Sequence, residues 1–174
     1  GDEPPKTADH SVQVYVSELR KALGGSSDGS TLVVRRDPGY TLDVPDTATD
    51  LQRFEGLRAR GRASLEVGEP ARASTLLAEA LGVWRGATLA DFAYDDFARG
   101  EIERLEELRL ATLEDRLDAD LALGRHGELI PELRALVDEH PTRERLRADL
   151  MLALYRSGRQ PESVEVFHAG RALL

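Results

Sequence analysis

Apolar residues recur with the period of an α-helix over most of the chain, and the pattern changes near residue 45. Beyond this point six segments repeat an apolar residue every three or four positions, as Leu51, Phe54 and Leu57 do in the first of them. This spacing places the apolar side chains on one face of a helix. We therefore predict six helices and an all-α fold for residues 50–174, with Thr49 or Asp50 capping the first helix.

Glycine and proline interrupt the helical pattern where turns are required. The interruptions are Gly68-Glu69-Pro70, Gly124-Arg125-His126-Gly127, His140-Pro141-Thr142 and Gly158-Arg159-Gln160-Pro161. Gly124 and Gly158 are 34 residues apart, which is the tetratricopeptide period, and Gly68 begins a comparable turn 56 residues before Gly124. We predict three helix pairs in a tetratricopeptide-like helical-hairpin array, an architecture that usually presents a concave surface to another protein.

The first 45 residues have a different order, which is helix, loop and hairpin. Residues 9–23 place Val12, Val16, Leu19 and Leu23 on one stripe of a helix, with Asp9 as a candidate N-cap and Gly24 as a stop. Residues 24–30 are a Gly/Ser/Asp loop. Residues 31–36 and 40–44 are β-branched and alternating, and the Asp37-Pro38-Gly39 turn between them predicts a β-hairpin. Residues 45–49 are interpreted as a linker.

Composition narrows the class of protein. The 174 residues have 41% hydrophobic and 32% charged residues and no cysteine, which indicates a globular chain without a disulfide, thiol nucleophile or thiolate metal site. No apolar run approaches the roughly 18 residues of a membrane span, and no leader opens the chain, so we expect a soluble, cytoplasmic protein. Because the chain begins at Gly1 without Met and stops inside a helical pattern, we expect it to be a fragment.

Candidate chemistry is sparse. The four histidines lack the spacing of a metal site, and neighbouring acids such as Glu106 and Glu107 point apart on a helix. The glycine-rich loop at residues 24–29 lacks the Gly-Lys-Ser/Thr ending of a phosphate cradle, and there is no Gly-x-Ser-x-Gly motif. The sequence thus predicts no catalytic residues, no metal and no cofactor, and the protein is not expected to be an enzyme.

The polar face of the helix at residues 9–23 is the candidate nucleic-acid interface. It carries His10, Gln13, Ser17, Arg20 and Lys21 opposite the apolar stripe. Such a helix can lie in a major groove, with the following hairpin touching the DNA backbone or the minor groove. The alternative is a surface helix with ordinary polar residues, and the spacing alone does not choose between the two.

The amino-acid sequence of this segment favours DNA binding over an ordinary surface helix. HSVQVYVSELRKAL followed by LVVRRDPGYTLDV resembles the recognition helix and wing of the winged-helix output domain of OmpR-type response regulators. The resemblance implies core roles for Val12, Val14, Val16 and Leu19, and it implies that the family's N-terminal sheet and first two helices are missing before Gly1. Glu18 departs from the family, which often has Arg there. The predicted DNA-binding residues of this partial winged helix, at residues 1–44, are His10, Ser11, Gln13, Ser17, Arg20, Lys21 and Arg36.

Residues 50–174 resemble the bacterial transcriptional activator domain of SARP-type regulators. The strings that carry the resemblance are WRGATLADF, RLEELRLATLEDRLDADLALGRH and ELIPELRALVDEHPTRERLRADLMLALYRSGRQ. The family implies a transcriptional activator that binds promoter repeats, forms homo-oligomers and contacts RNA polymerase or a sigma factor. The alternative function is a helical-repeat protein-interaction or regulatory module that does not itself bind DNA.

Aromatic and charged residues leave two further questions open. We expect Trp84 in the core, whereas Phe92, Tyr94 and Phe97 either fill a gap between helix pairs, which is favoured, or anchor a partner protein. The net charge of −9 divides into −2 for residues 1–44 (5 basic, 7 acidic) and −7 for residues 45–174 (18 basic, 25 acidic). The acidic total therefore does not exclude DNA binding, although residues 1–44 can release few counterions from DNA, so we expect the fragment alone to bind weakly.

Overall fold

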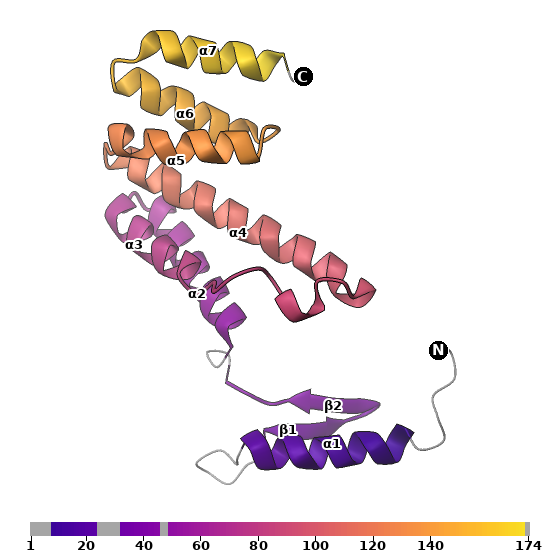
Figure 1. The fold of residues 1–174 in the computed structure, drawn as a ribbon. Coiled ribbons are helices and arrows are strands. Elements are labelled where there is room, and N and C mark those ends of the chain that lie inside the picture. Colours follow the sequence, from indigo (N-terminus) through magenta and orange to yellow (C-terminus); the bar gives the residue numbers. More distant parts are fainter. Residues whose placement is uncertain (1–7, 24–31, 46–48, 173–174) are drawn as a thin grey trace. The chain divides into compact units, whose positions relative to one another are not determined.

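The computed structural model describes residues 8–23, 32–45 and 49–172, and the chain divides into two compact units between Thr49 and Asp50 (Figure 1). The first unit contains α1 (Ala8–Leu23), β1 (Val33–Arg36) and β2 (Gly39–Leu42). The helices of the second unit are α2 (Asp50–Glu66), α3 (Pro70–Leu81), α4 (Asp96–Ala122), α5 (His126–Glu139), α6 (Glu144–Arg156) and α7 (Gln160–Arg171). The expected stop at Gly24, the loop at residues 24–30 and most of the expected linker lie outside the described residues.

The first unit is the predicted helix and hairpin. β1 and β2 pair antiparallel, with Val33 opposite Leu42 and Arg36 opposite Gly39. Of the apolar stripe predicted on α1, only Val16 is buried in the described structure, and the rest of the stripe stays exposed. The reason is that, in the described part of this unit, α1 packs against β1, and a strand of four residues leaves most of a 16-residue helix uncovered.

Three turns with the same geometry build the second unit from helix hairpins. Gly68, Gly124 and Gly158 all adopt left-handed backbone conformations, with φ of 77°, 80° and 77°. In each turn the glycine N–H donates to the carbonyl three residues earlier, and the next N–H donates to the carbonyl five residues before it. This is the Schellman arrangement, which satisfies the last carbonyls of a helix and favours glycine at the left-handed position. The predicted equivalence of the three turns is confirmed.

The helices of the second unit stack in chain order from α2 to α7 (Figure 1). The longest is α4, with 27 residues, which contacts α3 on one side and α5 and α6 on the other. A buried cluster around Phe54 and Leu76 joins α2 to α3, and a larger one around Leu117, Leu133 and Leu154 joins α4 to the helices that follow. The predicted all-α, tetratricopeptide-like array after a partial winged helix is confirmed. None of the described helices is long and apolar enough to cross a membrane.

Candidate functional site

The residues predicted to contact DNA are exposed in the first unit. His10, Gln13 and Ser17 follow one another at intervals of three and four positions on α1, so they share one helix face, and Lys21 continues it by one turn. Ser11 lies on the same helix outside this row. Arg36 is not on the helix, because it is the last residue of β1, at the tip of the hairpin. The helix and the hairpin thus contribute separate parts of the candidate nucleic-acid interface.

Arg20 has a geometry that sequence reasoning missed. Its Nε and Nη2 atoms both donate to the backbone carbonyl of Val33, at 2.9 and 2.7 Å. The guanidinium also lies 5.9 Å from the centre of the Tyr40 ring, within the range of a cation–π contact. Arg20 therefore ties α1 to both strands of the hairpin, and in this structure two of its donors are directed at the protein.

The hairpin tip carries the remaining basic side chains among the described residues of the first unit. Arg35 and Arg36 are consecutive on β1, so their side chains point to opposite faces of the hairpin, and both are exposed. Arg36 pairs with Gly39 across the ladder, next to the turn.

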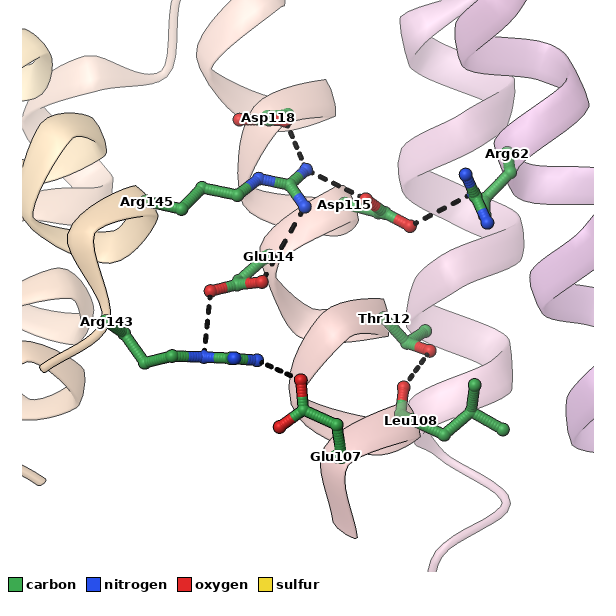
Figure 2. Close-up of polar contacts among 9 residues, drawn as sticks. All are labelled: Arg62, Glu107, Leu108, Thr112, Glu114, Asp115, Asp118, Arg143 and Arg145. Atoms are coloured by element: carbon green, nitrogen blue, oxygen red, sulfur yellow. Dashed lines mark hydrogen bonds and ion pairs between the residues drawn. The ribbon is translucent and has the colours of Figure 1, made fainter. Parts of the chain in front are cut away.

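In the second unit, the most concentrated polar chemistry lies on the face of α4 that meets α6. Figure 2 shows Arg145 of α6 directed at three carboxylates of α4. Its guanidinium lies 2.8 Å from Asp115 and 3.6 Å from Glu114, and it also donates to Asp118. Glu114 and Asp115 are buried, so these charges need a fixed partner in the folded protein.

Arg143 and Arg62 extend this network to the rest of the array (Figure 2). Arg143, just before α6, donates to Glu107 at 2.7 Å and lies 3.4 Å from Glu114. Arg62 of α2 lies 3.6 Å from Asp115 on the other side of α4. Asp115 is therefore in contact with arginines from the first and the third helix pair.

A second polar node lies one turn further along α4. Asp120 accepts hydrogen bonds from the Ser74 hydroxyl of α3 at 2.7 Å, from Arg116 at 2.8 Å and from Arg125 at 2.9 Å. Arg116 also reaches Glu132 of α5, at 2.5 Å. With three donors, the buried Asp120 carboxylate is well satisfied, and it links the first helix pair to the second.

Asp149 of α6 is the exception among the buried carboxylates. Only 8% of the residue is exposed, and its Oδ2 atom has no hydrogen-bond partner among the described residues. Burial, together with the negative charges of Asp118 and Glu114, raises the pKa of Asp149 to about 7, although Arg145 acts in the opposite direction. Nothing in the sequence indicated this group, because it stands on an ordinary amphipathic helix.

The aromatic residues of the connection between α3 and α4 and of the first turn of α4 differ in their burial. Trp84 packs edge-to-face against Phe54 at 5.2 Å and lies under the Arg109 guanidinium, so its predicted core role is confirmed. The favoured expectation that Phe92, Tyr94 and Phe97 fill a gap between helix pairs is wrong. These three side chains are 45%, 101% and 77% exposed. The physical reason is that the small Ala98, which is buried, occupies the contact position at the start of α4.

The described residues contain no group of three or more His, Asp or Glu side chains placed to hold a metal ion. Several of their buried polar groups, such as Asp115, Asp120 and Ser163, pair with residues of other helices. The features that could contact a partner are a polar helix face with a basic hairpin tip in one unit, and exposed aromatic side chains on the helical array in the other.

The chain is thus a two-part protein in which a partial winged helix precedes a tetratricopeptide-like array. The model of the bacterial transcriptional activator domain matches residues 49–174. The chain therefore belongs to the bacterial transcriptional activator domain family, and its predicted resemblance to SARP-type regulators is confirmed.

Similar proteins match the first unit as well as the second. The chain is 43% identical over 173 residues to the regulatory protein DnrI of Streptomyces peucetius, covering 96% of this chain and 64% of DnrI. It is 36% identical over 172 residues to the transcriptional regulatory protein EmbR of Mycobacterium tuberculosis, covering 98% of this chain and 44% of EmbR. The chain thus spans less than two thirds of the length of these relatives.

A solved structure supports the same relationship. The structure of M. tuberculosis EmbR, determined in complex with a low-affinity phosphopeptide, matches with a TM-score of 0.91 at 35% sequence identity. The match covers 99% of this chain and 46% of the EmbR chain. These relatives are named regulatory proteins and not enzymes.

Proposed function

We propose that this chain is part of a DNA-binding transcriptional activator, in which α1 and the hairpin contact promoter DNA and the helical unit contacts other proteins. The observation that carries the proposal is the exposed row of His10, Gln13 and Ser17 on α1, beside a hairpin whose tip presents Arg36. The name of EmbR, a transcriptional regulatory protein, supports it.

The proposed division of labour follows from the geometry of each side chain. The polar row on α1, with Ser11 and Lys21, would reach base edges and phosphates in a major groove, and Arg36 would reach the adjacent minor groove. Arg20 would act in two ways, through its remaining donors on a phosphate and through its hold on the Val33 carbonyl, which fixes the wing against the helix.

The helical unit would supply the activating contacts. Its net charge is strongly negative, so it has no electrostatic reason to approach phosphate. RNA polymerase, a sigma factor or a second copy of the protein are the proposed partners, and binding to promoter repeats would place several copies side by side. The alternative function is a helical interaction module without DNA binding, and the experiment must distinguish it from the proposed activator.

A gel-shift titration of the full-length parent protein on its promoter DNA tests the proposal. Arg36→Ala and Gln13→Ala should each weaken binding by about 10-fold, because a good contact is worth about 1–3 kcal/mol and each 1.4 kcal/mol is about a factor of ten. The matched control is Arg60→Ala, because Arg60 is also an exposed arginine but lies on α2. Absence of specific DNA binding by the parent protein would favour the interaction module, whereas equal DNA affinity for all four proteins would contradict the assignment of Gln13 and Arg36 to the DNA contact.

A further inference from the structure

Four large apolar side chains lie exposed on and beside the connection between α3 and α4. They are Leu89, Phe92, Tyr94 and Phe97, and we call them the aromatic loop. Tyr94 is fully exposed and Phe97 is 77% exposed. Single exposed apolar residues are ordinary, but four of them within nine residues form the kind of patch that marks an interaction surface.

The conformation of the aromatic loop is held by hydrogen bonds. The buried Thr88 hydroxyl donates to Glu106 of α4, which fixes the start of the loop. The N–H of Phe92 donates to the Leu89 carbonyl at 2.8 Å, and the N–H of Asp95 donates to the Phe92 carbonyl at 3.0 Å. The Phe92 and Phe97 rings meet edge-to-face at 5.7 Å. The exposed rings therefore stand on a fixed backbone, which lowers the entropy lost when a partner binds them.

The charges around the aromatic loop select the partner. Residues 89–103 contain five acids and one base, Arg99, which gives a net charge of −4. Arg99 is paired with Asp96 at 2.7 Å, so it does not offset the other acids. Glu101 is likewise paired with Arg104 at 2.7 Å, just past this segment. The acids that remain, Asp91, Asp95 and Glu103, flank the aromatic side chains along the chain. Such a surface repels nucleic acid and attracts a cationic partner with apolar anchors.

We infer that the aromatic loop is a docking site for an amphipathic helix of a partner protein whose apolar residues are flanked by Lys and Arg. Phe92, Tyr94 and Phe97 would supply the apolar contacts, and the acidic residues would set orientation and the rate of association. A symmetric contact between two copies would instead bring two acidic rims together, so the charge argues against a second copy as the occupant. The inference rests on the proposed function, since it assigns the activating contact of the helical unit to one surface.

Peptide titration followed by fluorescence anisotropy tests this inference on the 174-residue chain. The probe is a labelled helical peptide of about 18 residues, or five turns, with Leu on one face and Lys elsewhere, and its counterpart has Glu in place of Lys. We expect the Lys peptide to bind and the Glu peptide not to bind. The affinity of the Lys peptide should fall as ionic strength rises. The double variant Tyr94→Ser with Phe97→Ser should weaken binding at least about 10-fold. Because both side chains are exposed, circular dichroism should show an unchanged fold.

The matched control is Tyr155→Ser with Phe167→Ser, which removes two exposed aromatic side chains from α6 and α7. Equal loss of affinity in both double variants, or equal binding of the Lys and Glu peptides, would overturn the inference. The inference would also be overturned if Tyr94→Ser with Phe97→Ser converted a dimer into a monomer without changing the affinity for the peptide. A second copy of the chain would then be the occupant of the aromatic loop. Gel shifts of the full-length protein separate the two proposals, since the loop variant should keep DNA binding that Arg36→Ala weakens.

Discussion

The stability of the helical unit should depend on pH through Asp149. This carboxyl group is buried between α6 and α4, and Oδ2 has no hydrogen-bond partner among the described residues. From α4, Asp118 and Glu114 oppose its ionisation, while Arg145 of α6 favours it and His126 of α5 lines the same depression. Burial is the largest cause of a pKa of about 7, against 3.8 for an unperturbed aspartate.

The direction of the effect follows from the raised pKa. The folded state binds this proton more tightly than the unfolded state does, so the stabilisation is fully present below about pH 4 and is lost as pH rises through 7. The two values give a single-site difference between pH 6 and pH 8 of about 1.4 kcal/mol in the free energy of unfolding. Water at the rim of the depression screens part of this, so we expect about 1 kcal/mol.

Urea unfolding at pH 6 and pH 8, followed by circular dichroism and Trp84 fluorescence, measures this difference. The unsubstituted chain should be more stable at pH 6, and Asp149→Asn should lose that advantage because the amide does not titrate. The two proteins differ only at residue 149, so the difference between their pH dependences is assigned to that position. Asp118→Asn should move the transition to lower pH by removing a repelling charge. Greater stability at pH 8, or an unchanged pH dependence in Asp149→Asn, would refute the reasoning.

Three further substitutions test the packing of the helical unit, each by its urea midpoint. Arg145→Met should cost about 2 kcal/mol, because buried carboxylates of α4 lose a partner while Arg62 and Arg143 remain; an unchanged midpoint would contradict the network. Gly61→Ala should cost about 1–3 kcal/mol, since its Cβ would lie 2.6 Å from Leu77 Cγ. Gly56→Ala on the same helix has open space and should instead stabilise by about 0.5–1 kcal/mol. The pair would contradict this account if both changes had the same sign.

The elements that could be predicted from the sequence are those set by local rules. Gly68, Gly124 and Gly158 mark left-handed positions at helix ends, where the lack of a Cβ removes a steric penalty, so the turn is encoded in one residue. The hairpin was predictable for a similar reason, because turn residues at 37–39 separate two β-branched runs. Neither prediction required knowledge of what the helices pack against.

What the sequence did not indicate depends on tertiary contacts. The apolar stripe of α4 predicts one buried face. In the structure, however, α3 covers one side of this helix and α5 and α6 cover another, and Glu114 and Asp115 are buried. The role of Arg20 was missed because it lies 13 residues from the carbonyl that it binds. The orientation of Tyr94 and Phe97 depends on which residue occupies the contact with the core, and spacing does not reveal that Ala98 takes this place.

The buried polar nodes explain how three hairpins with the same turn geometry hold one arrangement. Leucine-rich faces can interdigitate in more than one register, because apolar packing has little directionality. A buried carboxylate is stable only where hydrogen-bond donors lie within reach of its oxygen atoms. Asp120 finds its donors where α3 meets α4, and Asp115 contacts Arg62 of α2 and Arg145 of α6 at once. Sliding either neighbouring pair by one turn would leave a carboxylate unpaired and buried, which costs more than the lost leucine contacts.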